Sequence, residues 1–495
     1  MKIIDKILNS VGLVRSVNLR ARYEVASPAR APLFPGQDSF SADAALNPGV
    51  RRAIRERCRT QIENDPNAEG IVDTYANDVV GTGPSVQVLS DDQVANDKIR
   101  DAFQEWAETD NLSEKLRLCV RAGLVDGEIF GLMMTNPRLN HPVKLSIKLI
   151  ETEQVSDPNP RAFTNPTDGI ILDEFDNPVK YVVLREHPGA TMRVDPLAYD
   201  VFSADLVLHY FKKKRAGQHR GVSMLAPSLI RFAYLNRFTL ATIVAAEHAA
   251  NHAGIIYSEA GPDGAEAVEP MDTIEFDKGT WTTMPSGWRL EQMKAEHPST
   301  TFEMFKKEMM GDAGRCVSMP TNVSTLNSSG YNFSSGKLDH LVYHKALGIV
   351  RALLVKMLLN RIFDAWLDEA ALAGIIPKLK VGDRTSVKRR WSWPGMEAID
   401  PTAESKATTE NIANGTLTLE RAHAEQGLDW RDELKQSMLE VKEMKDLMKK
   451  YGLEWADVAA FKGRQVQQQQ QQQPKPQSDG STQENANNDS NAPAQ

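Results

Sequence analysis

The chain has 495 residues, which at about 150 residues per domain allows about three domains. Lysine and arginine total 58 against 66 aspartates and glutamates, so the formal net charge is −8. This charge excludes a protein that coats nucleic acid with its whole surface, because such binding neutralises many phosphates. The three cysteines, Cys58, Cys119 and Cys316, lie far apart. We therefore expect reduced thiols of a cytoplasmic compartment, and neither a disulfide scaffold nor a cysteine-based zinc site.

No run of apolar residues approaches the length of about 18 that a membrane helix requires, so we expect no contact with a membrane. The first residues, MKIIDKILNSVGLVRSV, are interrupted by Asp5, Lys6 and Asn9, which argues against a signal peptide. They fit either a short amphipathic helix or a frayed terminus.

Three helices are predicted in the first part of the chain. An arginine-rich helix is expected from about residue 51 to Val80, where an apolar stripe of helical period stops at Gly81. A second helix begins at Asp92, where Ile99, Phe103 and Trp106 recur at spacings of four and three and predict a buried stripe. A third helix covers about 112–124.

Short β-branched segments bounded by turn residues fill 128–211: EIFGLMMT, VKLSIKLIE, GIILDE, VKYVVLRE and DLVLHYF. This is the β-rich part of the chain. Helices return at 224–252, and a compact segment rich in Gly, Pro and Asp follows at 254–299. A shorter helix at 300–315 precedes a polar loop.

The longest predicted helix runs from about Ser335 to Leu372. Gly348 lies inside it and allows a bend. Its expected buried face consists of apolar residues at helical spacing: Leu338, Leu341, Val342, Ala346, Ile349, Val350, Leu353 and Met357.

The pattern of residues 400–462 predicts polar helices, the first of which starts at Asp400-Pro401. A run of seven glutamines begins at Gln467 and is followed by Pro, Ser, Asn and Asp. This composition cannot bury a core, so the tail is expected to be disordered. The sequence contains no internal repeat.

One glycine-rich segment, GYNFSSGKL, is similar to a phosphate-binding loop. Five residues separate Gly330 from Gly336, whereas a P-loop has four, and Leu338 stands where the magnesium-binding hydroxyl belongs. No hydrophobic strand leads into the segment. The sequence therefore argues against an NTPase.

Two residue pairs have spacings that occur in enzymes. Ser334 and Lys337 fit S-x-x-K, but no S-D-N or K-T-G sequence accompanies them, and we expect Ser334 or Ser335 to cap a helix instead. His248 and His252 are four residues apart on a helix, but the glutamate that zinc proteases carry after the first histidine is replaced by alanine. We expect these histidines to pack or to line a channel.

A basic run, KKKR at 212–215, is followed by His219 and Arg220. It fits a solvated charge cluster, or a contact with phosphates or an acidic partner.

Five sequences occur in a fixed order along the chain: RRAIRERCRTQIENDPNAEGIVDTYANDVVGTGPSVQ, LVDGEIF, GQHRGVSMLAP, YNFSSGKLDH and RWSWPGMEAIDPTAESKA. In this order, over about residues 30–460, they resemble the lambda-type portal proteins of tailed bacteriophages. Gly336-Lys337 departs from the Arg-Ala pair that is more usual in the family, and Ser405 and Lys406 vary its charge pattern.

The resemblance implies an α+β, mostly helical fold with a β-rich wing, a helical stem, a small mixed clip and a helical C-terminal crown. The implied parts are an N-terminal segment 1–29, the wing 30–222, a stem helix 223–253, the clip 254–299, a second stem helix 300–315, a channel loop 316–335, a long wing helix and return 336–399, the crown 400–462 and a disordered Gln-rich tail 463–495.

The implied function is a ring, usually dodecameric, that forms the DNA channel at one capsid vertex, through which the genome is packaged and ejected. The implied partners are other copies of the chain, double-stranded DNA, the terminase large subunit that acts as a separate motor, the major capsid protein or scaffold, and a head-completion adaptor. The resemblance places the protein in the virion after assembly in the host cytoplasm, and it implies no catalysis, cofactor or metal.

The channel loop is expected to present neutral hydroxyls and amides to passing DNA, with Lys337 as the only fixed positive charge nearby. The candidate residues are Asn322, Ser324, Thr325, Asn327, Ser328, Ser329, Tyr331, Asn332, Ser334 and Lys337. Two other functions stay open: a cytoplasmic serine or metal hydrolase, and a non-portal head–tail connector that binds only protein.

Overall fold

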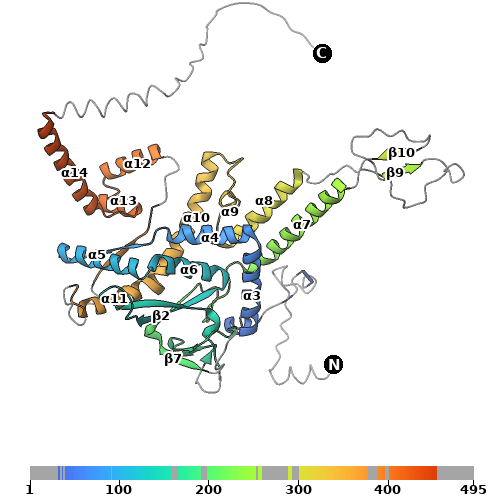
Figure 1. The fold of residues 1–495 in the computed structure, drawn as a ribbon, viewed down its shortest axis with the longest axis horizontal. Coiled ribbons are helices and arrows are strands. Elements are labelled where there is room, and N and C mark those ends of the chain that lie inside the picture. The colour runs from blue at the N-terminus through green and yellow to red at the C-terminus, as the bar shows by residue number, and fades with distance from the viewer. Residues whose placement is uncertain are drawn as a thin grey trace, which may run out of the picture. The chain divides into compact units, whose positions relative to one another are not determined.

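A computed structural model describes residues 32–33, 36, 39–90, 92–158, 166–190, 198–251, 255–258, 288–291, 300–376, 387–395 and 401–453. The chain divides into two units, Met1–Pro401 and Thr402–Gln495, and we treat each by itself (Figure 1). The first unit mixes helices with antiparallel sheets, which agrees with the expected α+β class.

The predicted arginine-rich helix is two helices, α3 (Pro48–Asn64) and α4 (Pro66–Val80), preceded by the short α2 (Ala42–Ala45). The break comes at Asp65, because Pro66 has no N–H to donate and disfavours helical geometry in the residue before it. The Asp65 side chain accepts a hydrogen bond from the Asn67 N–H and so caps α4.

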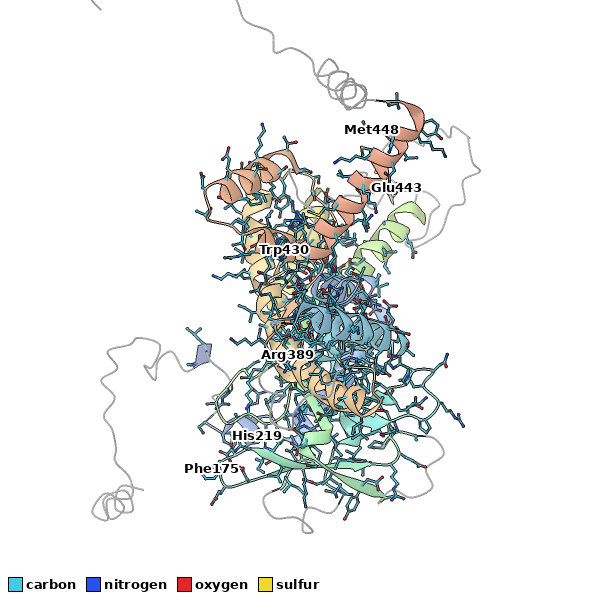
Figure 2. The ribbon with its side chains drawn as sticks, turned by 90° about the vertical axis from the view of Figure 1, so that its left-hand side faces the viewer. Phe175, His219, Arg389, Trp430, Glu443 and Met448 are labelled. Atoms are coloured by element: carbon cyan, nitrogen blue, oxygen red, sulfur yellow. The ribbon has the colours of Figure 1, made fainter. Side chains whose placement is uncertain are left out.

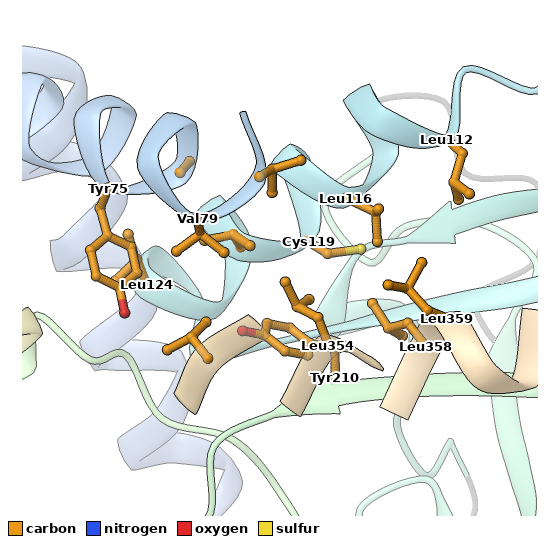
Figure 3. Close-up of a cluster of buried hydrophobic side chains, with 14 of the residues drawn as sticks. Tyr75, Val79, Leu112, Leu116, Cys119, Leu124, Tyr210, Leu354, Leu358 and Leu359 are labelled. Carbon is orange, nitrogen blue, oxygen red and sulfur yellow. The ribbon is translucent and has the colours of Figure 1, made fainter. Parts of the chain in front are cut away.

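Helices α5 (Gln93–Thr109) and α6 (Leu112–Val125) pack with α4 on the largest hydrophobic core of the described residues. Figure 3 shows part of this core, with Val79 of α4 and Leu116 of α6. Phe103 of α5 forms edge-to-face contacts with Phe363 and Trp366, whose ring centroids lie 5.1 and 5.2 Å from its own. The stripe expected on α5 is therefore confirmed as a core face.

The β-rich part forms two antiparallel sheets. One has the order β3-β2-β8, from Leu145–Ile150, Glu128–Thr135 and Val207–Phe211. The other has the order β4-β5-β6-β7, from Pro166–Thr167, Ile170–Leu172, Pro178–Leu184 and Tyr199–Ser203. A smaller core between residues of both sheets includes Phe130, Ile170 and Tyr181. A separate pair joins β1 (Ser85–Val88) to β11 (Arg389–Ser392).

Helices α7 (Leu229–Asn251) and α8 (Thr300–Gly314) lie side by side (Figure 1). Phe238 stacks on Phe302 at 5.7 Å, and Arg231 pairs with Asp312 at 2.9 Å. Between them β9 (Ile255–Ser258) and β10 (Trp288–Glu291) pair antiparallel, while the rest of the expected clip lies outside the described residues.

Among the described residues, one helix, at Ala226–Glu247, is long and apolar enough to cross a membrane by length and composition alone, although no such span was expected. Only 11% of its most apolar stretch is buried within the chain. A single helix of this kind is weak support for a membrane span.

The longest predicted helix is observed as three consecutive helical segments: α10 (Phe333–Leu354), a π-helical turn (Val355–Leu359) and α11 (Asn360–Leu372). Its irregularity lies at the π-helical turn and not at Gly348. Asn332 caps α10 by accepting the Ser335 N–H at 2.8 Å, so the expected cap by Ser334 or Ser335 is wrong.

The predicted buried face of the long helix is confirmed at Val350, which is buried, and at Leu353 and Met357, which pack against the core, but it is wrong at four other positions. Leu338, Leu341, Val342 and Ile349 are exposed, by 65, 56, 58 and 62% respectively. The residues that pack inside are Tyr343, Leu347, Val350 and Leu354.

The second unit contains helices α13 (Leu419–Glu425) and α14 (Trp430–Tyr451), and α12 (Pro401–Ala413) begins at its boundary (Figure 2). Among its described residues only Ala422 and Met448 are buried hydrophobic side chains. The glutamine run and the tail lie outside the described residues.

Candidate functional site

A buried ionic cluster joins two of the short sequences that carry the resemblance. Glu128 of LVDGEIF and Arg220 of GQHRG are 0 and 1% exposed, and the Arg220 Nε donates to the Glu128 carboxylate at 2.9 and 3.1 Å. Two charged residues are thus among the most buried side chains of the described chain.

Further groups complete this cluster. The His209 Nε2 lies 3.0 Å from Glu128, and the Gly221 N–H donates to the same carboxylate at 2.7 Å. Burial alone would raise the pKa of Glu128, but Arg220 and His209 outweigh it and hold that pKa below its usual value. Burial lowers the pKa of His209 and so disfavours the charged form of this imidazole.

The cluster extends to the N-terminal helices through Asp168, which pairs with both Arg220 and Arg51 of α3. It therefore links α3, the two sheets and the segment that leads into α7. Close contacts between backbone segments next to this cluster explain why two positions of the same short sequences are glycines. A Cβ on Gly127 would lie 2.2 Å from the Val222 carbonyl carbon, and one on Gly221 would lie 2.2 Å from the Gly127 oxygen.

All four residues of the basic run at 212–215 are exposed, as in a solvated cluster, and Arg215 also donates to the Phe40 carbonyl at 2.9 Å. His219 is 2.7 Å from Asp43, and Arg220 belongs to the buried ionic cluster. Through these contacts, the segment before α7 is bonded to residues 40–43 near the N-terminal helices.

The expected channel loop is more ordered than a plain polar loop. A short helix, α9 (Thr321–Ser324), follows Pro320, and Asn322 and Ser324 are buried, with exposed fractions of 8 and 7%. The Asn322 Nδ2 lies 3.0 Å from the His340 Nε2 of α10. These two candidate residues therefore pack inside their own chain, which corrects the expectation that they face a channel.

The rest of the candidate loop is open to solvent. Asn327, Ser328, Ser329, Asn332 and Ser334 are exposed, whereas Thr325, Tyr331 and Lys337 are half-buried. The loop also lies against a second cation, because the Lys307 Nζ of α8 is 5.4 Å from the centre of the Tyr331 ring. The expectation that Lys337 is the only nearby fixed charge is therefore wrong.

Ser334 and Lys337 lie in the first turn and a half of α10, beside the Asn332 cap. The side chain of His248 and all of His252 lie outside the described residues, so the expectation that they pack or line a channel stays a prediction.

One group of described residues has a spacing that suits a metal ion: Glu151, Glu153 and His187. The Gly189 N–H donates to the His187 Nδ1 at 3.0 Å, and the His187 Nε2 lies 3.1 Å from the Glu151 carboxylate without a hydrogen bond to it. Burial would raise the pKa of Glu153, but Arg55 and Arg59 outweigh it and lower that pKa. Arg55 and Arg59 already neutralise Glu153, so we assign no metal to this group.

Three helices present apolar side chains that nothing in the described chain covers. On α7 these include Ile230, Tyr234 and Leu240, with exposed fractions of 65, 58 and 62%. Met304 of α8 is 70% exposed, and the outer face of α10 adds four aliphatic residues. A monomer with so much exposed apolar surface is typical of a protein that associates.

Comparison with known proteins identifies the family. A family model described as phage portal protein, lambda family, matches residues 36–351. A curated relative from Halomonas phage phiHAP-1, named probable portal protein, is 23% identical over 431 residues, with 80% of this chain and 81% of the relative covered.

Two solved structures show a more distant likeness. A chain in the neck of an empty GTA particle, computed with C6 symmetry, is 12% identical at a TM-score of 0.48, with 76% of this chain and 94% of that chain covered. A chain in the neck of a native GTA particle, computed with C12 symmetry, is 14% identical at a TM-score of 0.46, with 77% and 94% covered. Both TM-scores are below 0.5. The family match confirms the resemblance seen in the sequence: the protein belongs to the lambda family of phage portal proteins, a structural rather than an enzymatic family.

Proposed function

We propose that this portal protein assembles into a closed ring, dodecameric as the family resemblance implies, at one vertex of a capsid. Double-stranded DNA passes along the axis of the ring during packaging and ejection. The ring binds the terminase large subunit, which supplies the motor, and also the major capsid protein or scaffold and a head-completion adaptor. It is assembled in the host cytoplasm, stays in the virion, and catalyses no reaction.

The observation that carries the ring is the uncovered face of α10. Its inner face packs on α4, while Leu338, Leu341, Val342 and Ile349 form an apolar stripe on the outer face. A ring built from head-to-tail contacts needs two different complementary surfaces on each subunit. A helix with one face in its own core and the other uncovered supplies one of them.

The parts of the proposed ring follow from the elements. Helices α7 and α8 form the stem, and the segment between them, of which β9 and β10 are described, forms the clip. The exposed part of the loop before α10 lines the channel, through Asn327, Ser328, Ser329, Asn332 and Ser334. Residues 30–222 form the wing and 400–462 the crown.

The charge of the chain supports passage rather than binding of DNA. A subunit with a net charge of −8, repeated around a ring, repels a polyanion. Neutral hydroxyls and amides on the loop exchange hydrogen bonds with phosphates without the affinity that counterion release gives to a lysine or arginine lining.

The test is assembly of the purified protein, followed by sedimentation and by negative-stain images. The wild type should form rings with a central hole. Val342→Asp introduces a charge into the outer face of α10 and should release monomers. Val94→Asp on α5 is the matched control, because Val94 is 66% exposed and Val342 is 58% exposed. A wild type that stays monomeric at micromolar concentration, or a Val342→Asp variant that forms rings as well as the control, would contradict the proposal.

A further inference from the structure

A cavity of about 380 Å³ lies between α4, α10 and the segment that follows β11. Asn77 and Asp78 line it from the last turn of α4, and His340, Tyr343 and Arg351 line it from α10. The carbonyl oxygens at the C-terminal end of α4 make this end of the helix partially negative. The cavity is large enough to admit a long side chain.

Asp78 is the acidic group of this cavity. Its carboxylate accepts a hydrogen bond from the neutral Tyr343 hydroxyl at 2.8 Å. Arg351 is nearby, but its guanidinium donates to the backbone carbonyls of Val79 and Asp78 at 2.8 and 3.0 Å. Within the part of the chain that the structure describes, no cationic nitrogen lies within 4.0 Å of the Asp78 carboxylate.

The charges around Asp78 also indicate that its carboxylate lacks a close cationic partner. Burial raises the pKa of this carboxyl group, and the Tyr343 hydroxyl, His344, Arg351 and His340 do not offset the effect. A carboxylate in such a position gains from one more cation.

A cation stands on the other side of the same helix. Lys345 is two residues from Tyr343, and a turn of about 100° per residue puts the two on nearly opposite faces of α10. Lys345 is exposed, and its neighbours on the outer face are the exposed Leu341, Val342 and Ile349. It is thus a single positive charge within an apolar stripe.

We propose that Lys345 of one subunit enters the cavity of the next subunit and pairs there with Asp78, while the apolar residues around Lys345 cover the rim. This inference rests on the ring proposed above and names the surface that the outer face of α10 meets. The occupant of the cavity is therefore a second copy of this chain.

Geometry favours a second copy over the same chain. Because the cavity and Lys345 lie on opposite faces of one helix, Lys345 cannot reach the Asp78 of its own subunit. Two different surfaces on opposite sides of one element are what a closed head-to-tail ring requires. The aliphatic stem of a lysine can cross an apolar contact while its ammonium group reaches a carboxylate beyond it.

The first test is a disulfide between subunits. Lys345→Cys combined with Asn77→Cys places one thiol on each proposed surface, and oxidation of assembled rings should give a ladder of linked chains on a non-reducing denaturing gel. Lys98→Cys combined with Asn77→Cys is the matched control and should give none, because Lys98 is an exposed lysine on α5. Single-cysteine variants account for Cys58, Cys119 and Cys316.

The second test is a change of charge. Lys345→Glu should raise the protein concentration at half-assembly by about tenfold or more, since close charge pairs across interfaces couple at least this strongly. Lys98→Glu should leave it unchanged, and Lys345→Arg should retain most of the assembly.

The outcomes separate the two proposals. Rings of wild-type protein without a Lys345–Asn77 cross-link, or with a Lys345→Glu variant that assembles like the Lys98→Glu control, overturn this inference and leave the ring intact. A wild type that never forms rings overturns both proposals.

Discussion

Replacing Glu128 by glutamine should be one of the most damaging single changes in the first unit. Arg220 is 1% exposed, and the change removes the buried carboxylate that accepts from its Nε, so that Asp168 is the only acidic side chain still paired with it among the described residues. Removing one partner of a buried ion pair costs about 3–5 kcal/mol in the free energy of unfolding. The loss is measured by chemical denaturation followed by tryptophan fluorescence, since Trp106 and Trp366 are fully buried.

Two comparisons show whether burial is the cause. Asp200→Asn breaks the exposed pair with Arg185, whose side chains are 62 and 45% exposed, and should cost only about 0–1 kcal/mol. The double change of Glu128→Leu with Arg220→Met removes both charges and should be more stable than Glu128→Gln. The reasoning is refuted if Glu128→Gln costs no more than Asp200→Asn, or if the double variant is the least stable.

The same residue sets a dependence on pH. The folded state holds the pKa of Glu128 below the ordinary value of 4.5, because Arg220 and His209 outweigh the effect of burial. A carboxyl group with a lowered pKa contributes stability above its unfolded pKa, and this contribution is lost as the pH falls through the folded pKa. The wild type should therefore lose stability below about pH 4.5 more steeply than Glu128→Gln, as denaturation at a series of pH values will show.

Three further changes test other parts of the chain. Deletion of 467–495 should leave ring formation in sedimentation unchanged, because the segment has almost no apolar side chains; loss of rings would show that it packs. Ser334→Ala and Lys337→Met should also leave rings intact, and the wild type should hydrolyse neither ATP nor esters, whereas turnover abolished by either change would establish an enzyme. Replacing Asn327, Ser328 and Ser329 by arginine should slow DNA packaging, because the added charges bind phosphates. This slowing should become weaker as the salt concentration rises. Normal packaging at low salt would show that this loop does not face DNA.

The sequence predicts a helix or its end well where the local pattern of residues has only one structural interpretation. The stripe with Ile99, Phe103 and Trp106 can only be buried by packing, and it forms the core of α5. The break at Asp65 also has a local cause in Pro66, and attention to that proline would have found it. The ends of α4 and α6 were predictable because Gly81 and Gly127 adopt positive φ angles of 58° and 92°.

The ionic cluster shows what local patterns omit. Glu128 and Arg220 are 92 residues apart, and each looks like an ordinary surface charge. Their pairing depends on β2 lying next to β8, which brings His209 and the following segment to the same place. The order of strands in a sheet is a tertiary property, so the two short sequences could be recognised but not paired. The same holds for Asn322, which is buried where α9 packs against α8 and α4, and whose side chain contacts His340 of α10.

The outer face of α10 gives the most instructive disagreement. Leucines and valines at helical spacing predict that a face is removed from water, and they do not say which chain removes it. The helix carries two such faces: Tyr343 and Leu347 pack inside the subunit, while Leu341 and Val342 stay exposed. An apolar stripe that the chain does not cover costs solubility unless another chain covers it, which is why this failed prediction of a core is the strongest support for the ring.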